Sequence, residues 1–115
     1  MVIIRFSVFE EKVKNGEKKQ TIRPCQNYRR LKVADAVHCY STERRAGTRP
    51  VTKELLYRGI CIQNKETTWG AIKNNEDIAW LDGFLSAKEM RQWFEKQYPR
   101  LHDTSCFRII QWISK

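Results

Sequence analysis

The chain has 115 residues, of which 41% are hydrophobic and 30% charged. This composition suits a single folded domain over residues 1–115 and argues against a disordered chain. No apolar run approaches the roughly 18 residues needed to cross a bilayer, and the N-terminal apolar stretch is too short for a signal peptide. We therefore expect a cytoplasmic location and no membrane partner. Lysine and arginine total 22 against 13 acidic residues, and the net charge of +9 indicates an anionic partner, most often nucleic acid.

The N-terminal segment is expected to form a buried strand followed by a short helix. Residues 2–6 (VIIRF) have the composition of a buried strand. Ser7 and Glu10 then match a capping box, which predicts a helix from about Val8 to Asn15. Gly16 follows as a helix stop.

The next segment, KKQTIR (18–23), has the period of a strand and is ended by a proline. On a regular strand Thr21 and Arg23 share one face, while Ile22 points to the core. Lys18 has the opposite parity to Thr21. It can therefore join Thr21 and Arg23 only if it lies in the turn before the strand begins.

The middle of the chain predicts strands separated by basic loops. Residues 25–35 are expected to form an irregular basic loop, and residues 36–41 a strand. Residues 42–52 contain turn-forming glycine and proline. A longer strand is expected over 55–64, with Gly59 at a bulge or a close approach. Residues 67–75 predict another short strand, or a strand and a turn.

The C-terminal part predicts one longer helix and a final strand. Ser86 and Glu89 form a second capping box, and Pro99 closes the helix. Residues 106–113 alternate like a strand. With five or six strands, one short helix in the N-terminal half and one longer helix before the last strand, the pattern predicts an α+β fold, a small mixed β-barrel.

The aromatic residues of this region have two interpretations. Trp93, Phe94 and Tyr98 follow helical spacing and are expected in the core. Trp80 and Phe84 flank Asp82 and are candidates for the wall of a cleft.

The four cysteines show no metal-binding or disulfide pattern. Cys25, Cys39, Cys61 and Cys106 include no C-x-x-C pair, and they are interpreted as free thiols in a reducing compartment. The sequence also has no phosphate loop, dinucleotide fingerprint or metal motif, so no metal or other cofactor is expected.

Basic residues concentrate in the loops. The candidate nucleic-acid-binding residues are Lys19, Arg23, Tyr28, Arg29, Arg30, Lys32, Tyr40, Arg44, Arg45 and Arg49. Arginine clusters bind phosphates through paired hydrogen bonds, and aromatic rings stack on bases. The alternative is that these are ordinary solvated loops.

A family resemblance adds to this interpretation. The motif G-E-K-K-Q-T-I-R (16–23) resembles the G-x-K-x-x-T-I-R signature of ASCH domains, which share the PUA-like barrel. Residues 31–45 resemble the family's K-x-G-D segment, with Ala34 where the family usually has glycine. Residues 78–99 resemble its acidic residue, glycine and aromatic, followed by a helix that ends at tyrosine-proline. The resemblance covers nearly the whole chain.

The resemblance implies a PUA-like barrel with a positively charged cleft suited to RNA or a modified nucleoside. Some small bacterial members are amidohydrolases of N4-acetylcytidine, in which a lysine and a threonine of the motif act with a downstream glutamate. The corresponding residues here are Lys18, Thr21 and Asp82, an aspartate in place of the glutamate.

Three functions therefore stay open at this point. One is an RNA- or nucleotide-binding module. The second is a hydrolase of an acylated pyrimidine nucleoside or of RNA. The third is a protein-interaction domain with a basic face. Ordinary structural roles are the alternative for each candidate residue: a solvated turn for Lys18 and Lys19, a strand position for Thr21, and a turn for Asp82. The oligomeric state is not specified by the sequence.

Overall fold

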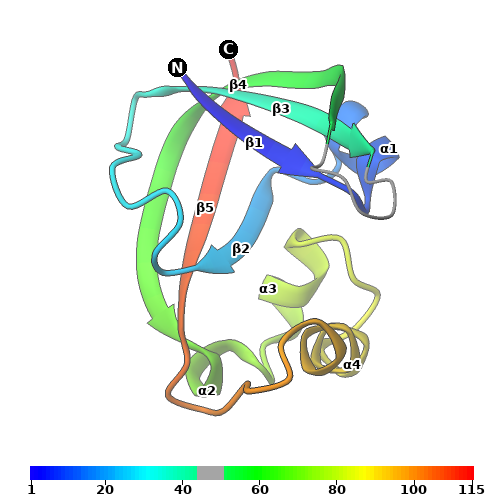
Figure 1. The fold of residues 1–115 in the computed structure, drawn as a ribbon, viewed down its shortest axis with the longest axis vertical. Coiled ribbons are helices and arrows are strands. Elements are labelled where there is room, and N and C mark those ends of the chain that lie inside the picture. The colour runs from blue at the N-terminus through cyan, green and yellow to red at the C-terminus, as the bar shows by residue number, and fades with distance from the viewer. Residues whose placement is uncertain (44–50) are drawn as a thin grey trace.

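The computed structural model describes residues 1–43 and 51–115, in which five strands and four helices form an α+β fold (Figure 1). In chain order the elements are β1 (Val2–Phe6), α1 (Glu10–Lys14), β2 (Gln20–Pro24), β3 (Ala36–Glu43), β4 (Val51–Thr68), α2 (Trp69–Ile72), α3 (Glu76–Leu81), α4 (Ala87–Gln97) and β5 (Cys106–Ser114). The predicted α+β class and the expectation of five or six strands are confirmed, whereas the expected barrel is a half-barrel and only two helices were expected.

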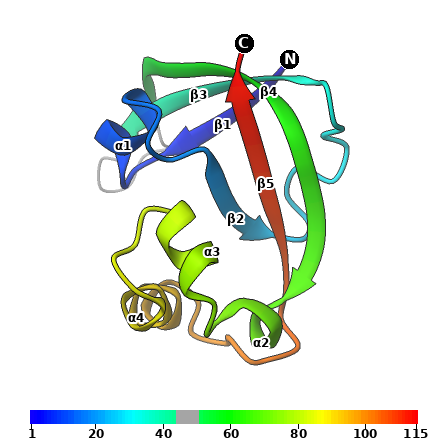
Figure 2. The same ribbon diagram turned by 180° about the vertical axis from the view of Figure 1, so that it is seen from behind.

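The strands form one mixed sheet in the order β1-β3-β4-β5-β2. β1 pairs with β3 in parallel, and the other neighbours are antiparallel. The sheet curls into a half-barrel, because the long strand β4 bends from its pairing with β3 to its pairing with β5 (Figure 2). The predicted close approach at Gly59 is confirmed, since a Cβ there would lie 2.7 Å from the carbonyl oxygen of Ile113.

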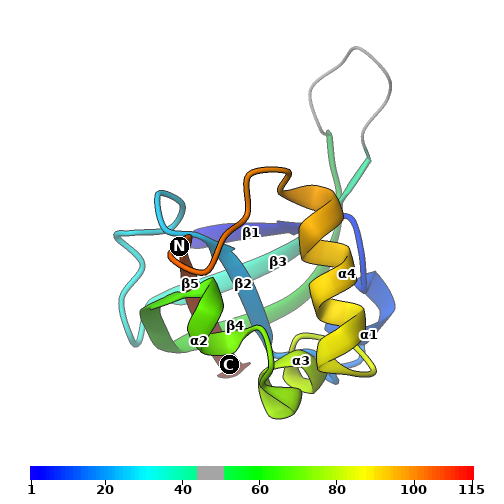
Figure 3. The ribbon, with the colours of Figure 1, turned by 90° about the horizontal axis from the view of Figure 1, so that it is seen from below.

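Two hydrophobic cores hold the molecule together. One fills the inside of the curled sheet around residues such as Ile4, Val37 and Trp112. The other lies between the sheet and the helices, where Phe94 and Phe107 pack edge to face at 5.5 Å. Seen from below, α2, α3 and α4 lie against one side of the sheet (Figure 3). The second core therefore fixes α3 and α4 relative to β2.

The first capping box is not formed, so that prediction was wrong. Helix α1 begins at Glu10, and its N-cap residue is Phe9, which has a left-handed backbone (φ 58°) and makes no side-chain cap bond. The Phe9 ring packs against Phe84 at 5.0 Å and lies directly against Gly83. The gain from burying this ring outweighs the hydrogen bond that a Ser7 cap would supply.

The prediction of a strand over 67–75 was also wrong. β4 ends at Thr68, and α2 begins at Trp69, whose ring stacks on Phe94 at 4.7 Å. Helix α3 follows, and the Asn75 side chain caps it by accepting a hydrogen bond from the Ile78 amide at 3.0 Å. Aromatic and β-branched residues favour strands locally, but here they face the helical core.

The Ser86 cap of the second predicted capping box is confirmed, whereas the bond from Glu89 returns to the residue before the cap. The Ser86 hydroxyl accepts a hydrogen bond from the Glu89 amide at 3.1 Å, at the start of α4. The Glu89 carboxylate accepts from the amide of Leu85 at 3.2 Å. These bonds satisfy amide groups at the helix N-terminus.

The interpretation of all four cysteines as free thiols was wrong. Cys25 and Cys106 form a disulfide across 81 residues, because the pairing of β2 with β5 places Pro24 opposite Phe107. Cys39 and Cys61 are free and buried, as expected of small hydrophobic residues. Within the described residues, no group of three or more His, Cys, Asp or Glu side chains is placed to hold a metal ion. No helix in those residues is long and apolar enough to cross a membrane.

Candidate functional site

One pocket brings together the polar residues of the sequence motif. Lys18, Thr21 and Arg23 line it from the turn before β2 and from β2 itself, and Asp82 lines it from the end of α3. Its cavity volume is about 100 Å³. The other lining residues are Arg5, Phe6, Ser7, Val8, Phe9, Ile22, Phe84, Trp93, Phe94 and Tyr98. Lys18 lies in the turn before β2, which is the position that the sequence required if Lys18 was to join Thr21 and Arg23.

The end of α3 fixes the position of Asp82. Asp82 is the C-cap residue, and Gly83 follows with a left-handed backbone (φ 107°). The Phe84 amide donates back to the Ala79 carbonyl at 3.0 Å, which closes the helix terminus. The Lys12 ammonium donates to the Gly83 carbonyl at 2.7 Å. The aspartate-glycine turn is therefore a helix cap that directs Asp82 into the pocket.

Lys18 and Asp82 form a buried ion pair. The Lys18 Nζ lies 3.2 Å from Asp82 Oδ2 and also donates to the Asp82 carbonyl oxygen. Only 3% of the Lys18 side chain is exposed. Burial lowers the pKa of Lys18 below its ordinary value of 10.5, and the Asp82 carboxylate opposes this effect.

Two glutamines, which the sequence analysis missed, support the carboxylate. Gln20 Nε2 lies 3.4 Å from Asp82 Oδ1 and donates to the Ile78 carbonyl at 3.1 Å. The Gln111 amide donates to Gln20 Oε1 at 3.0 Å. These bonds hold one Asp82 oxygen while the other faces Lys18. No local sequence signal indicates them, because Gln20 and Gln111 meet only through the pairing of β2 with β5.

Arg23 is held against the hydroxyl of Thr21. Its Nε donates to Thr21 Oγ1 at 2.9 Å, and its Nη2 donates to the Arg5 carbonyl at 2.7 Å. The guanidinium lies over the Phe6 ring, 5.0 Å from its centroid. The predicted common face of Thr21 and Arg23 is confirmed, and Ile22 is buried in the core. The guanidinium charge would stabilise negative charge on the Thr21 oxygen.

Aromatic rings form the walls of the pocket. Lys18 Nζ lies 5.7 Å from the Phe6 centroid and 5.4 Å from the Phe9 centroid. Phe84 lines the same pocket, as considered from the sequence. Trp93 was expected only in the core but also lines the pocket, and it is half-buried. Trp80 is 68% exposed and lines a separate depression, so it is no wall of this pocket.

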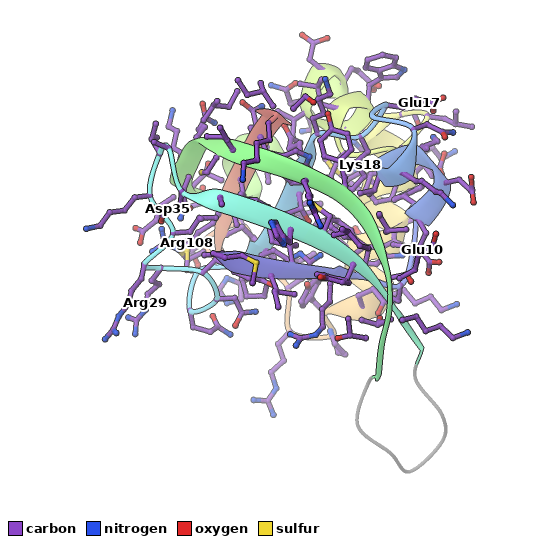
Figure 4. The ribbon with its side chains drawn as sticks, turned by 90° about the horizontal axis from the view of Figure 1, so that it is seen from above. Glu10, Glu17, Lys18, Arg29, Asp35 and Arg108 are labelled. Carbon is purple, nitrogen blue, oxygen red and sulfur yellow. A yellow bond between two sulfur atoms is a disulfide. The ribbon has the colours of Figure 1, made fainter. Side chains whose placement is uncertain are left out.

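The predicted basic residues do not all gather at the pocket. Arg29, Arg30 and Lys32 are exposed on the loop before β3, and Arg29 lies well apart from Lys18 (Figure 4). The backbone carbonyls of Tyr28 and Leu31 accept hydrogen bonds from the Asn64 amide, both at 2.9 Å.

The remaining basic candidates lie elsewhere. Lys19 is exposed and lines a different depression. Tyr40 pairs with Arg5 between β3 and β1 but does not itself line the pocket. The last three candidates, Arg44, Arg45 and Arg49, lie outside the described residues.

Comparison with known proteins does not assign the chain to a family. No protein-family model matches the chain, and neither a curated protein nor a solved structure is significantly similar to it.

Proposed function

We propose that this chain is an ASCH-like, PUA-like domain that binds RNA or a nucleotide in the pocket between β2, α3 and α4. The observation that carries the proposal is that one pocket combines a fixed arginine with aromatic walls. Asp82 neutralises Lys18, whereas Arg23 forms no ion pair with a described carboxylate and donates its hydrogen bonds to the Thr21 hydroxyl and the Arg5 carbonyl. Its charge is therefore available to a phosphate, while a base can contact the rings.

Direct binding tests this proposal. Fluorescence anisotropy with a fluorescein-labelled, mixed-sequence RNA decamer should show binding at 50 mM salt that weakens steeply at 200 mM salt, because phosphate contacts release counterions. Arg23→Met should weaken binding at least tenfold. Lys88→Met removes one charge from an exposed position on α4 and serves as the control. If the decamer does not bind at low salt, or if both variants weaken it equally, the proposal is wrong.

A second candidate function is hydrolysis of an acylated pyrimidine nucleoside. The resemblance to ASCH domains implies this chemistry too, because some members are amidohydrolases of N4-acetylcytidine. It is favoured by the meeting of Lys18, Thr21 and Asp82 in one pocket. In this scheme the Thr21 hydroxyl attacks the amide carbonyl, and its proton is accepted by the Lys18–Asp82 pair. The tetrahedral oxyanion is stabilised by Arg23, the bond between the carbonyl carbon and nitrogen breaks, and the proton is returned to the leaving nitrogen. Water then attacks the acetyl ester on Thr21 and passes its proton to the same pair, so that acetate and the free hydroxyl are released.

N4-acetylcytidine is the substrate that tests this chemistry. Incubation with the protein should release cytidine and acetate, which chromatography separates from the substrate. Thr21→Val preserves the shape of the side chain and should abolish release, because it removes the hydroxyl. Ser7→Ala removes another pocket hydroxyl and serves as the control. No release by the wild-type protein, or release that survives in Thr21→Val and Lys18→Ala, would eliminate these roles.

A further inference from the structure

A second hollow adjoins the pocket on the other side of Tyr98. This groove is lined by Pro24, Gln26, Gln97, Tyr98, Arg100 and Phe107, among other residues, and its volume is about 410 Å³. Tyr98 lines both the pocket and the groove. The chain also joins them directly, because Arg23 in the pocket is followed by Pro24 in the groove.

The lining of the groove suits a nucleobase with its phosphate. Pro24 and Tyr98 are half-buried and offer apolar and aromatic surface on which a base can stack, whereas Phe107 is only 3% exposed. The amides of Gln26 and Gln97 are exposed and make no hydrogen bond with the described residues. Amide side chains of this kind can bind base edges through both donors and acceptors.

The charge near the groove is positive. Arg100 is exposed and has no ion pair with any described residue. The nearby Asp103 carboxylate is occupied by Lys73 at 2.8 Å, so it does not cancel the charge of Arg100. Beyond Gln26 the chain continues into the loop that exposes Arg29 and Arg30. Pocket, groove and basic loop therefore follow one another along a single stretch of chain.

We propose that the groove binds the nucleotide next to the one in the pocket, so that the ligand of this site is single-stranded RNA rather than a free nucleoside. This inference rests on the proposed function of the pocket. The strand runs from the pocket across Tyr98 into the groove, and its backbone continues toward Arg29 and Arg30. Two contacts fix the start of this loop, residues 25–35. Cys25 forms the disulfide with Cys106, and the Arg108 Nε donates a hydrogen bond to the Cys25 carbonyl at 2.8 Å.

A comparison of two probes tests the inference. The first is the labelled mixed-sequence RNA decamer, and the second is the set of four ribonucleoside 5′-monophosphates, each added as a competitor. The decamer should bind at least tenfold more tightly than any of the mononucleotides. The double variant Gln97→Ala/Arg100→Ala should remove most of this advantage and leave the mononucleotide affinities within twofold. Gln26→Ala, which alters a third polar residue of the groove lining, should also reduce this advantage.

The control is Gln92→Ala/Lys88→Ala, which removes an amide and a charge from exposed positions on the same helix. Arg29→Ala/Arg30→Ala should reduce the slope of log Kd against log salt by about 0.7 for each phosphate that the loop no longer neutralises. The inference is overturned if a mononucleotide binds as tightly as the decamer, if the groove and control variants behave alike, or if that slope does not change. If the pocket does not bind nucleotide at all, the result is different, because Arg23→Met then changes the affinity of neither the decamer nor the mononucleotides.

Discussion

The Lys18 ammonium lies 3.2 Å from the Asp82 carboxylate, although 64 residues separate them, and both side chains are buried. A buried ion pair is a weak source of stability when intact, but losing one partner leaves an uncompensated buried charge. Asp82→Ala should therefore lower the free energy of unfolding by about 3–5 kcal/mol. In the double variant Lys18→Met/Asp82→Leu, most of that loss should be recovered. Urea unfolding of the wild type, Asp82→Ala and the double variant measures this recovery, and equal losses in the Asp82→Ala and double variants would contradict it.

The lowered pKa of Lys18 predicts an unusual dependence of stability on pH. Between the folded-state pKa and the ordinary value of 10.5, the unfolded chain binds more protons than the folded chain. The contribution of Lys18 to the free energy of unfolding is therefore smallest below the folded-state pKa and rises with pH toward 10.5. Urea unfolding between pH 7 and pH 10 should show the wild type gaining stability relative to Lys18→Met/Asp82→Leu. A constant or falling difference would contradict the predicted direction.

Ala34 has a left-handed backbone, with φ of 80°. Only glycine adopts this conformation without steric cost, so Ala34→Gly should raise the free energy of unfolding by about 1 kcal/mol. The control is Ala71→Gly at an exposed position in α2, which should lower it by about 0.5–1 kcal/mol, because glycine weakens helices. Thermal unfolding compares the two variants. A loss of stability in Ala34→Gly would mean that the turn does not have this conformation.

The disulfide predicts the number of reactive thiols. Denatured, non-reduced protein should titrate two thiols per chain with Ellman's reagent, namely Cys39 and Cys61, whereas four would exclude the Cys25–Cys106 bond. In the native protein Cys39 should be unreactive, because burial raises the pKa of its thiol to about 12. Reduction should lower the free energy of unfolding by about 4 kcal/mol, as expected for a loop of this length. Cys25→Ser/Cys106→Ser should be equally destabilised and insensitive to reductant.

The local signals in the sequence predicted much of the fold but not its long-range contacts. Strand periodicity located the five strands, and the Ser86 cap located α4. Helix α3 was missed although a signal was present: Asn75 followed by two acidic residues is a typical helix start. The start of α1 could not be predicted, because it depends on Phe9 packing against Gly83 and Phe84, far along the chain.

For the candidate site too, the sequence predicted local features but not long-range contacts. The motif and the strand parity predicted that Thr21 and Arg23 face one side, and the hydrogen bond between them confirms it. The Gln20 support of Asp82 and the Cys25–Cys106 bond both require the register of β2 on β5, which no short segment encodes. The sequence indicated Arg29 as a candidate for binding nucleic acid but not its position relative to the pocket, and it lies well apart from Lys18.

The location of bound nucleotide tests the central claim most directly. In a titration of ¹⁵N-labelled protein with the RNA decamer, followed by two-dimensional NMR, we predict that the largest amide shifts occur at Thr21, Arg23 and Phe84. These shifts should be lost in Arg23→Met, while the rest of the spectrum is preserved. Saturable binding whose shifts leave those three amides unmoved would contradict the claim, because the RNA would then occupy another surface.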